Sequence, residues 1–180
     1  MKLTAYLSAL VFSTLPVLGL AADRTVYGLT ERVQLPELGV QLAAKLDTGA
    51  ETASLSARDI QRFKRDGQSW VRFVVAGSPE GNPPIERPLL RTSQIKRRAG
   101  DCACDTDSSQ TRTSRPVVEL RLCLGRTLRM VPVNLTDRSA FQYPLLLGAQ
   151  ALKDFAAIVD PSLADTAGAP ACAADALPAG

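Results

Sequence analysis

The chain has 180 residues, of which 46% are hydrophobic and 22% charged, and its formal net charge is +3. This composition is typical of one globular domain with a hydrophobic core, and so small a charge argues against a nucleic-acid-binding protein. The sequence contains no histidine, which excludes Ser-His-Asp and Cys-His catalysis, HExxH zinc sites and mixed Cys/His zinc sites. Carboxylate chemistry, lysine chemistry and cysteine-only metal sites remain.

The N-terminus has the pattern of a secretory signal peptide. Lys2 gives a positive start, Leu3 to Leu18 form an apolar stretch, and Gly19-Leu20-Ala21 has the small-x-small form of a cleavage site. The sequence therefore predicts a signal peptide over residues 1–21, cleaved near Ala21. The mature protein is expected to be periplasmic or secreted, with no stable membrane anchor. An uncleaved anchor is the alternative.

The domain predicted over residues 22–162 begins with two strands. The mixed polar and apolar residues of Thr25–Leu35 favour an edge strand. Pro36–Gly39 has the composition of a turn. Val40–Leu46 is predicted to be a strand that enters the core and ends at Asp47.

The following segment is predicted to contain a strand, a helix and a second strand. Ala53–Ser56 favours a short return strand, and its last residue forms a capping-box pattern with Asp59. This pattern predicts a short helix that ends at Gly67. Ser69–Ala76 alternates as a strand, with Trp70 expected in the core.

A long segment over residues 77–115 is rich in Pro, Ser, Thr and Arg. A loop of this length in a compact domain is either functional or disordered. We therefore regard it as a candidate flap that closes over a substrate and excludes water.

Short elements complete the domain. Val117–Leu124 and Thr127–Leu135 alternate in polarity on either side of Gly125-Arg126, which predicts a hairpin. The remaining expectations, in chain order, are a buried run at Pro144–Gly148, a short helix at Ala149–Phe155, a last strand at Ala156–Val159 that Asp160-Pro161 ends, and a disordered Ala/Pro-rich tail over residues 163–180. The predicted fold class is mainly β.

Four cysteines follow the predicted cleavage site, namely Cys102, Cys104, Cys123 and Cys172. An exported protein meets an oxidising compartment, so disulfides are expected, but the spacing leaves all three pairings open. Cys102 and Cys104, with their neighbouring aspartates, could instead bind a metal ion. A disulfide to Cys123 or Cys172 is favoured over that metal site.

The residues best suited to catalysis are Asp47-Thr48-Gly49, directly after a predicted strand. The strand holds the carboxylate on a rigid element, Thr48 can hydrogen-bond around the turn, and Gly49 allows close approach of the backbone. On this triplet alone, an ordinary polar turn is favoured. Aspartic peptidases, however, pack such a loop on a later hydrophobic-hydrophobic-Gly element, which Leu146-Leu147-Gly148 supplies here.

Further segments match one family in order and spacing. They are Leu35–Gly39, Ala44–Ala50, Phe63–Phe73, Arg115–Val118, Leu135–Ser139, Tyr143–Leu152 and Val159–Pro161. On these residues the sequence resembles the bacterial retropepsin-like aspartic peptidases that are often labelled ATP-dependent zinc proteases. The sequence supports neither part of that label, because it has no histidine and no GxxxxGK[ST] phosphate loop.

The resemblance implies a closed retropepsin-like β-barrel with one or two short helices, no cofactor and no metal. It implies Asp47 as the catalytic carboxylate. Two positions depart from the family pattern, because Ala149 stands where Arg is usual and Thr113 where an acidic residue is usual. The supporting residues that it implies are Thr48, Gly49, Ala50, Thr52, Leu146, Leu147 and Gly148.

One Asp-Thr-Gly in the chain predicts a homodimer. An aspartic peptidase needs two carboxylates about 3 Å apart that share one proton, and a two-fold axis places Asp47 opposite its own copy. Asp165-Thr166-Ala167-Gly168 echoes the motif, but no strand precedes it, so we reject it as the second aspartate.

Other polar residues have less specific roles. Thr52 and Ser54 are expected to hydrogen-bond beneath Asp47, and Lys45 is expected to face solvent. Asp137-Arg138 is either an ion pair that orients a loop near the site or a turn with a surface salt bridge.

The leading hypothesis is an aspartic endopeptidase acting on proteins or peptides in the cell envelope. The first alternative is a non-catalytic protein on the same fold that binds peptides or envelope material in the same groove. The second is an interaction protein stabilised by its cysteines.

Overall fold

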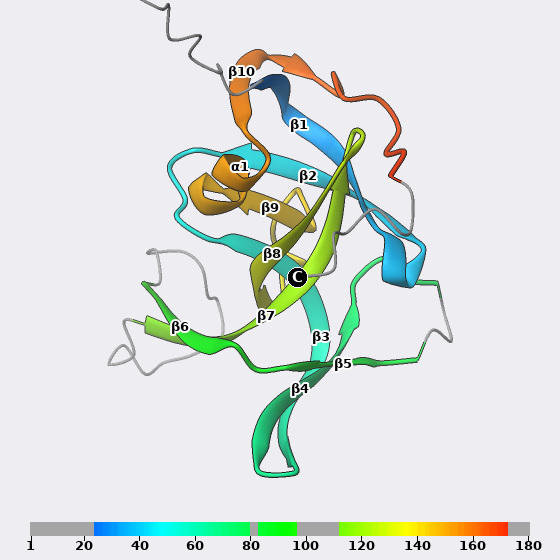
Figure 1. The fold of residues 1–180 in the computed structure, drawn as a ribbon. Coiled ribbons are helices and arrows are strands. Elements are labelled where there is room, and N and C mark those ends of the chain that lie inside the picture. Colours follow the sequence, from blue (N-terminus) through cyan, green and yellow to red (C-terminus); the bar gives the residue numbers. More distant parts are fainter. Residues whose placement is uncertain (1–23, 80–82, 97–111, 173–180) are drawn as a thin grey trace, which may run out of the picture.

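The computed structural model describes residues 24–79, 83–96 and 112–172, so the predicted signal peptide lies outside the described residues. The described chain forms one sheet of ten strands with a short α-helix and a 3-10 turn (Figure 1). No helix in this part of the chain is long and apolar enough to cross a membrane. The elements are β1 (Thr25–Leu35), η1 (Pro36–Leu38), β2 (Val40–Asp47), β3 (Ala53–Arg65), β4 (Gln68–Val75), β5 (Ile85–Pro88), β6 (Arg91–Lys96), β7 (Arg112–Leu124), β8 (Thr127–Thr136), β9 (Leu145–Gly148), α1 (Ala149–Asp154) and β10 (Ala157–Ala164).

Six of these strands close into a barrel. Their order is β1-β2-β9-β3-β8-β7, and β7 returns to β1 through the pairs Val33–Leu124 and Gln34–Cys123. Closure leaves the barrel strands without free edges. The predicted class, a mainly β closed barrel of retropepsin type, is confirmed.

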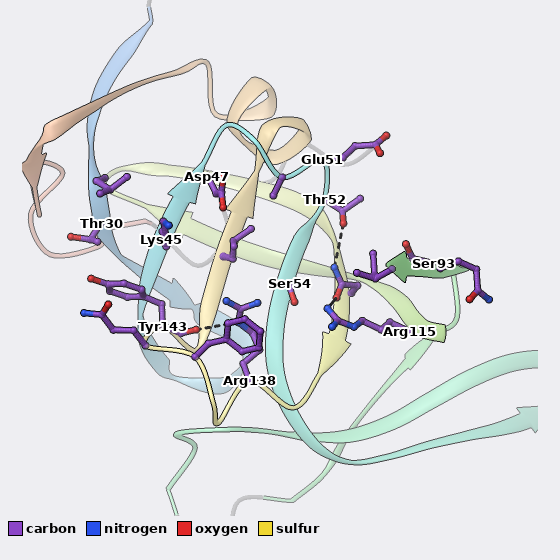
Figure 2. Close-up of a pocket in the computed structure, with 18 residues that line it drawn as sticks. Thr30, Lys45, Asp47, Glu51, Thr52, Ser54, Ser93, Arg115, Arg138 and Tyr143 are labelled. Atoms are coloured by element: carbon purple, nitrogen blue, oxygen red, sulfur yellow. Dashed lines mark hydrogen bonds between the residues drawn. The ribbon is translucent and has the colours of Figure 1, made fainter. Parts of the chain in front are cut away.

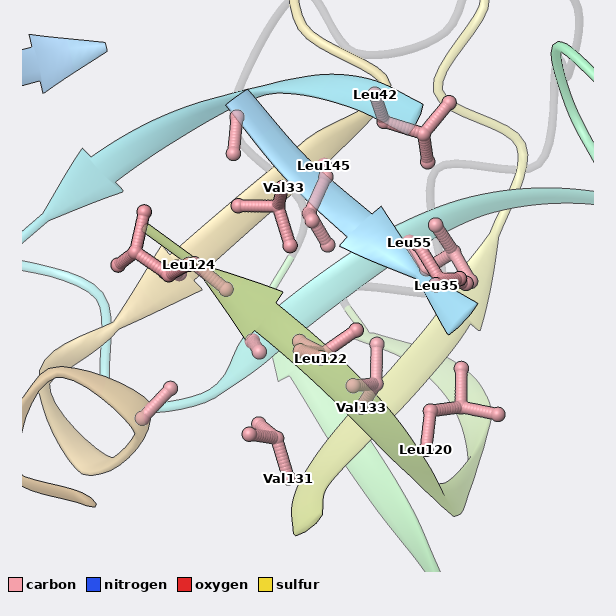
Figure 3. Packing of buried hydrophobic residues seen from close by; sticks show 14 of the residues in the cluster. Val33, Leu35, Leu42, Leu55, Leu120, Leu122, Leu124, Val131, Val133 and Leu145 are labelled. Carbon is pink, nitrogen blue, oxygen red and sulfur yellow. The ribbon is translucent and has the colours of Figure 1, made fainter. Parts of the chain in front are cut away.

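The barrel is filled by aliphatic side chains that alternate along its strands. Leu120, Leu122 and Leu124 of β7 point inward beside Val131 and Val133 of β8, and all of them are buried (Figure 3). Each such side chain contributes about 1.5–3 kcal/mol through removal of apolar surface from water. The alternation that predicted the β7–β8 hairpin therefore also builds the core.

Thr25–Leu35 is a strand, as predicted, but it is not an edge strand. β1 pairs with β2 on one side and with the parallel strand β10 on the other, and its end also pairs with β7. β10 is the edge of the sheet instead, and it continues through Asp160-Pro161 to Ala164. Alternation along a strand reports its two faces and says nothing of its neighbours.

The predicted helix that ends at Gly67 is wrong, because β3 runs through this segment to Arg65. Asp59 has a positive φ of 54° where the pairing with β4 is irregular, so the apparent capping residue lies in a bulge. Asp66 and Gly67, both with positive φ, form the turn between β3 and β4. This hairpin projects from the barrel (Figure 1).

Trp70 is part of this hairpin and is not a core residue. Its ring lies 6.5 Å from that of Phe63, its partner across the strands. The guanidinium of Arg65 lies 4.6 Å above the Trp70 ring. These contacts stabilise a hairpin that stands outside the core.

Residues 163–172 differ from the disordered tail expected over residues 163–180, and residues 173–180 lie outside the described part. The buried carboxylate of Glu31, 1% exposed, accepts hydrogen bonds from the backbone N–H groups of Gly28 at 2.7 Å, Thr166 at 3.0 Å and Ala167 at 3.1 Å. The Thr166 hydroxyl also donates to it. One buried acid therefore binds a segment whose composition resembles a linker.

A disulfide joins Cys123 of β7 to Cys172, with the Cα atoms 6.0 Å apart. It holds the end of the described chain against the barrel, where the Ala171 N–H also donates to the Gly125 carbonyl at 2.7 Å. The favoured disulfide from Cys102 or Cys104 to one of these two cysteines is therefore wrong, because Cys123 and Cys172 pair with each other. Cys102 and Cys104, with the possible metal site there, lie outside the described residues.

We predict that Glu31→Gln lowers the free energy of unfolding by about 2–3 kcal/mol, because an amide replaces a charged acceptor of several hydrogen bonds. Urea unfolding followed by tryptophan fluorescence measures the change. Glu119→Gln, at an exposed position on β7, is the matched control and should stay within about 0.5 kcal/mol. Equal stability of the two variants would contradict this role for Glu31.

Candidate functional site

The segment that follows β2 is held by the start of α1. Asp47 is the last residue of β2 and pairs with Gly148 of the parallel strand β9. The carbonyl of Ala50 accepts a hydrogen bond from the Ala149 N–H at 2.7 Å, and that of Glu51 accepts one from the Gln150 N–H at 3.1 Å. Because the first N–H groups of a helix lack partners within it, α1 supplies the donors that hold this loop.

Gly148 permits the close approach of the two segments. A Cβ atom there would lie 2.7 Å from the carbonyl carbon and oxygen of Thr52 and 2.8 Å from the carbonyl oxygen of Ala50. Its φ of −86° is accessible to any residue, so space and not backbone conformation demands glycine. Gly148 thus lets the Leu-Leu-Gly strand pack directly against the backbone of the loop that follows Asp47.

The carboxylate of Asp47 is oriented by its own loop. Its Oδ1 accepts a hydrogen bond from the Gly49 N–H at 3.0 Å. The Asp47 carbonyl accepts another from the Ala50 N–H at 3.2 Å. Asp47 is half-buried, whereas Thr48 and Gly49 are exposed. A partially shielded, fixed carboxylate beneath an exposed turn can be approached by another molecule.

A pocket of about 620 Å³ lies beside Asp47 (Figure 2). One register row across the barrel supplies much of its lining, because these residues pair strand to strand. The row consists of Thr30 (β1), Lys45 (β2), Leu146 (β9), Ser54 (β3) and Asn134 (β8).

Some of the residues considered in the sequence line this pocket and others do not. Lys45, expected in solvent, is half-buried and lines the pocket. Leu146 also lines it, while Leu147 points to the opposite face of β9 and is fully buried in the core. Ser93, Gln94 and Ile95 of β6, from the candidate flap segment, line the pocket as well. Residues 97–111 of that segment lie outside the described residues.

Thr52 does not hydrogen-bond to Asp47. Its hydroxyl accepts a hydrogen bond from the Asn134 side chain at 3.2 Å, and the same amide nitrogen donates to the Ala53 carbonyl at 2.6 Å. The Asn134 side-chain oxygen lies 3.4 Å from Arg115 Nη1. Asn134 therefore joins the loop to a cation in the pocket wall. In the sequence, Asn134 stands out only as a polar residue within a largely apolar strand, and this pattern does not identify its hydrogen-bond partners.

Arg138 is buried on the loop between β8 and β9. Its backbone N–H donates to the Ser56 hydroxyl at 3.1 Å, and its Nε donates to the Tyr143 carbonyl at 3.1 Å. Its guanidinium carbon lies 4.6 Å from the centre of the Phe141 ring. Burial, together with the charge of Arg115, lowers the pKa of Arg138 from its usual value.

Neither alternative for Asp137-Arg138 describes the structure. The Asp137 carboxylate accepts a hydrogen bond from the Ser139 N–H at 2.8 Å, and hydrogen bonds with Ser139 lower the pKa of Asp137. Among the described residues, no salt bridge involves Arg138. The arginine is thus neither ion-paired with Asp137 nor exposed at a surface turn.

Within the described ranges, no group of three or more Cys, Asp or Glu residues could hold a metal ion. The charged groups that line this pocket are the carboxylates of Asp47 and Glu51 and the cations of Lys45, Arg115 and Arg138.

A closed six-stranded barrel with an Asp-Thr-Gly loop on a Leu-Leu-Gly strand defines a single-lobe protein of the retropepsin-like class. The family model described as RimB-like, retropepsin-like aspartic endopeptidase RimB, matches residues 26–170. The chain belongs to this RimB-like family.

Related proteins share the matched region. A protein of Desulfotalea psychrophila named probable alpha-L-glutamate ligase is 32% identical over 144 residues, and one of Shewanella pealeana with the same name is 30% identical over 141 residues. Each alignment covers 78% of this chain and 29% of the relative, so the chain spans under a third of these proteins. A solved Legionella pneumophila protein of unknown function is 35% identical, with a TM-score of 0.63, covering 81% of this chain and 99% of its own.

We predict that Gly148→Ala lowers the free energy of unfolding by about 2–3 kcal/mol, because the added methyl group would overlap backbone atoms that cannot rotate away. Thermal and urea unfolding measure the loss. Gly49→Ala is the control for stability, since its Cβ would meet only Asp47 Oδ1, at 3.4 Å. Wild-type stability of Gly148→Ala would show that the loop does not depend on this contact.

Proposed function

We propose that this protein is an aspartic endopeptidase of the cell envelope, with an active site formed by the Asp47 residues of two identical chains. The observation that carries the proposal is the placement of Asp47. Its carboxylate is oriented by Gly49, half-buried at the wall of a large pocket and reached through an exposed turn. Membership of the RimB-like family supports the same chemistry.

The proposed reaction needs a pair of carboxylates. When two carboxyl groups lie about 3 Å apart, they cannot both ionise, so one keeps a proton. The ionised carboxylate takes a proton from the attacking water, and the protonated one donates a hydrogen bond to the scissile carbonyl. The described chain carries one Asp-Thr-Gly on a barrel strand. In the similar segment Asp165–Gly168, the N–H groups of Thr166 and Ala167 donate to the Glu31 carboxylate. Because this segment is not available as a second catalytic loop, a two-fold homodimer is the favoured source of the second aspartate.

The pocket suits a peptide substrate. Its volume of about 620 Å³ lies within the usual range of ligand sites, about 300–1,000 Å³. Apolar residues such as Leu146 and Phe141 line it beside polar and charged groups, which fits a chain with mixed side chains and a polar backbone.

An exported location is part of the proposal. The predicted signal peptide motivates it, and the disulfide between Cys123 and Cys172 supports an oxidising compartment. The ligase named for the curated relatives is not carried over, because this chain spans 29% of the first of them.

We predict that Asp47→Asn lowers kcat/KM for unfolded protein substrates on the order of 10³-fold or more, because an amide cannot serve as the base. Cleavage is followed by mass spectrometry from acid to neutral pH. Asp66→Asn, in the β3–β4 turn, is the matched control, and Asn tolerates the same positive φ. Undiminished cleavage by Asp47→Asn would exclude the proposed mechanism. Binding without cleavage by the wild type would favour the non-catalytic alternative.

The shared active site has its own test. Wild-type protein and Asp47→Asn protein are refolded together in equal amounts. Random pairing leaves about a quarter of the dimers with two aspartates. Activity should therefore fall to about a quarter of that of wild-type protein refolded alone at the same total protein concentration. A fall to one half, as expected for independent sites, would contradict the paired active site.

A further inference from the structure

We propose that Arg138, Ser54 and Arg115 form a carboxylate-binding subsite at the part of the pocket away from Asp47, and that this subsite anchors a carboxylate of the bound peptide. Figure 2 shows Asp47 toward one end of the pocket and the two arginines toward the other, with Ser54 on β3 between them. The inference rests on the proposed function for the identity of its ligand, a peptide.

Arg138 is held in place before any ligand binds. Its backbone N–H donates to the Ser56 hydroxyl, and its Nε donates to the Tyr143 carbonyl. Its guanidinium group also contacts the Phe141 ring. It is only 7% exposed, and within the described ranges no carboxylate lies at salt-bridge distance from it. Buried arginines usually have an anionic partner, so this one is prepared for an anion from outside the chain.

Ser54 provides an independent observation. It lines the pocket, is 4% exposed, and its buried hydroxyl has no hydrogen-bond partner in the structure. Such groups are rare, because a buried hydroxyl without a partner is costly. Ser54 lies two residues before Ser56 on the same face of β3, about 7 Å along the strand. The hydroxyl is therefore near the loop that Ser56 fixes and can donate to a ligand oxygen there.

Arg115 adds a second positive charge from β7. Its Nη1 lies 3.4 Å from the Asn134 side-chain oxygen, and Asn134 is the neighbour of Ser54 in the barrel. The charge of Arg115 is close enough to lower the pKa of Arg138. A ligand anion in this part of the pocket would therefore meet two positive charges.

The donor geometry favours a carboxylate. A guanidinium presents parallel N–H groups that match the two oxygens of a carboxylate, and a hydroxyl can complete the contact. In a peptide this group is either an acidic side chain or the C-terminus, and both place the same two oxygens in the subsite. The cleavage residues lie elsewhere in the pocket, so the subsite would fix the position of the chain relative to Asp47.

Binding is tested without cleavage, in the Asp47→Asn protein. Fluorescent peptides carry either Glu or Gln at the centre and either a free or an amidated C-terminus, and Kd is measured by anisotropy. We expect loss of one carboxylate to weaken binding about tenfold or more, as for one charge-assisted hydrogen bond. Sensitivity to Gln assigns the side chain, and sensitivity to amidation assigns the C-terminus. Equal binding of all the peptides would overturn the proposal.

Second-site variants in the same Asp47→Asn background locate the effect. Arg138→Met and Ser54→Ala should each abolish or reduce the preference for the carboxylate, whereas Arg126→Met, at an exposed turn, should retain it. Ser54→Ala should also have an equal or higher Tm, because it removes an unpaired buried hydroxyl. This combination keeps the test decisive if Arg138→Met does not fold. A full preference in folded Arg138→Met would overturn the assignment, and so would a full preference in Ser54→Ala if Arg138→Met does not fold.

The two proposals fail separately. If the wild type does not cleave but the Asp47→Asn protein prefers carboxylate peptides through Arg138 and Ser54, the subsite stands and the peptidase does not. If cleavage depends on Asp47 but every peptide binds equally, the peptidase stands and the subsite is wrong.

Discussion

The close contact between the Asp47 loop and Gly148 is the constraint on which the site depends. Parallel pairing of β2 with β9 places Asp47 beside a glycine, and the missing side chain lets the carbonyls of the loop approach the start of α1. Two backbone hydrogen bonds from Ala149 and Gln150 then hold the loop. In the proposed mechanism Asp47 meets a second carboxylate at hydrogen-bond distance, and such an arrangement needs a rigid support, since small displacements weaken catalysis greatly. The pairing of β2 with β9, the start of α1 and the position of Asp47 therefore belong to one packing arrangement.

The two arginines of the pocket come from other elements than its two acids. Asp47 ends β2 and Glu51 lies in the loop after it, while Arg115 lies on β7 and Arg138 on the loop after β8. The third cation, Lys45, lies on β2 near Asp47. Asn134 links these regions by bonding both Thr52 and Arg115. The proposed catalytic and binding groups therefore come from different parts of the barrel.

The C-terminal segment completes the barrel from outside. Glu31 binds Thr166 and Ala167, and the Cys123–Cys172 disulfide holds the following residues. Glu31 is a buried acid whose stabilising role depends on this segment, and the segment, rich in Ala and Gly, has little apolar surface with which to pack by itself. The disulfide connects this local structure to the proposed export, because such bonds persist in oxidising compartments.

The class of fold, the position of Asp47 at the end of a strand and its Leu-Leu-Gly partner could be predicted from the residues alone, because alternation and short motifs are local signals. The β7–β8 hairpin could be predicted in the same way. The strand at Ser56–Arg65 became apparent only in the folded chain, because pairing with β4 outweighed a local capping pattern. The same holds for the C-terminal segment, whose order depends on a buried acid more than 130 residues earlier. Arg138 and Ser54 show the limit most clearly. Within the described chain Arg138 has no carboxylate at salt-bridge distance and the Ser54 hydroxyl has no hydrogen-bond partner, and a sequence alone cannot show which interactions folding leaves unmade.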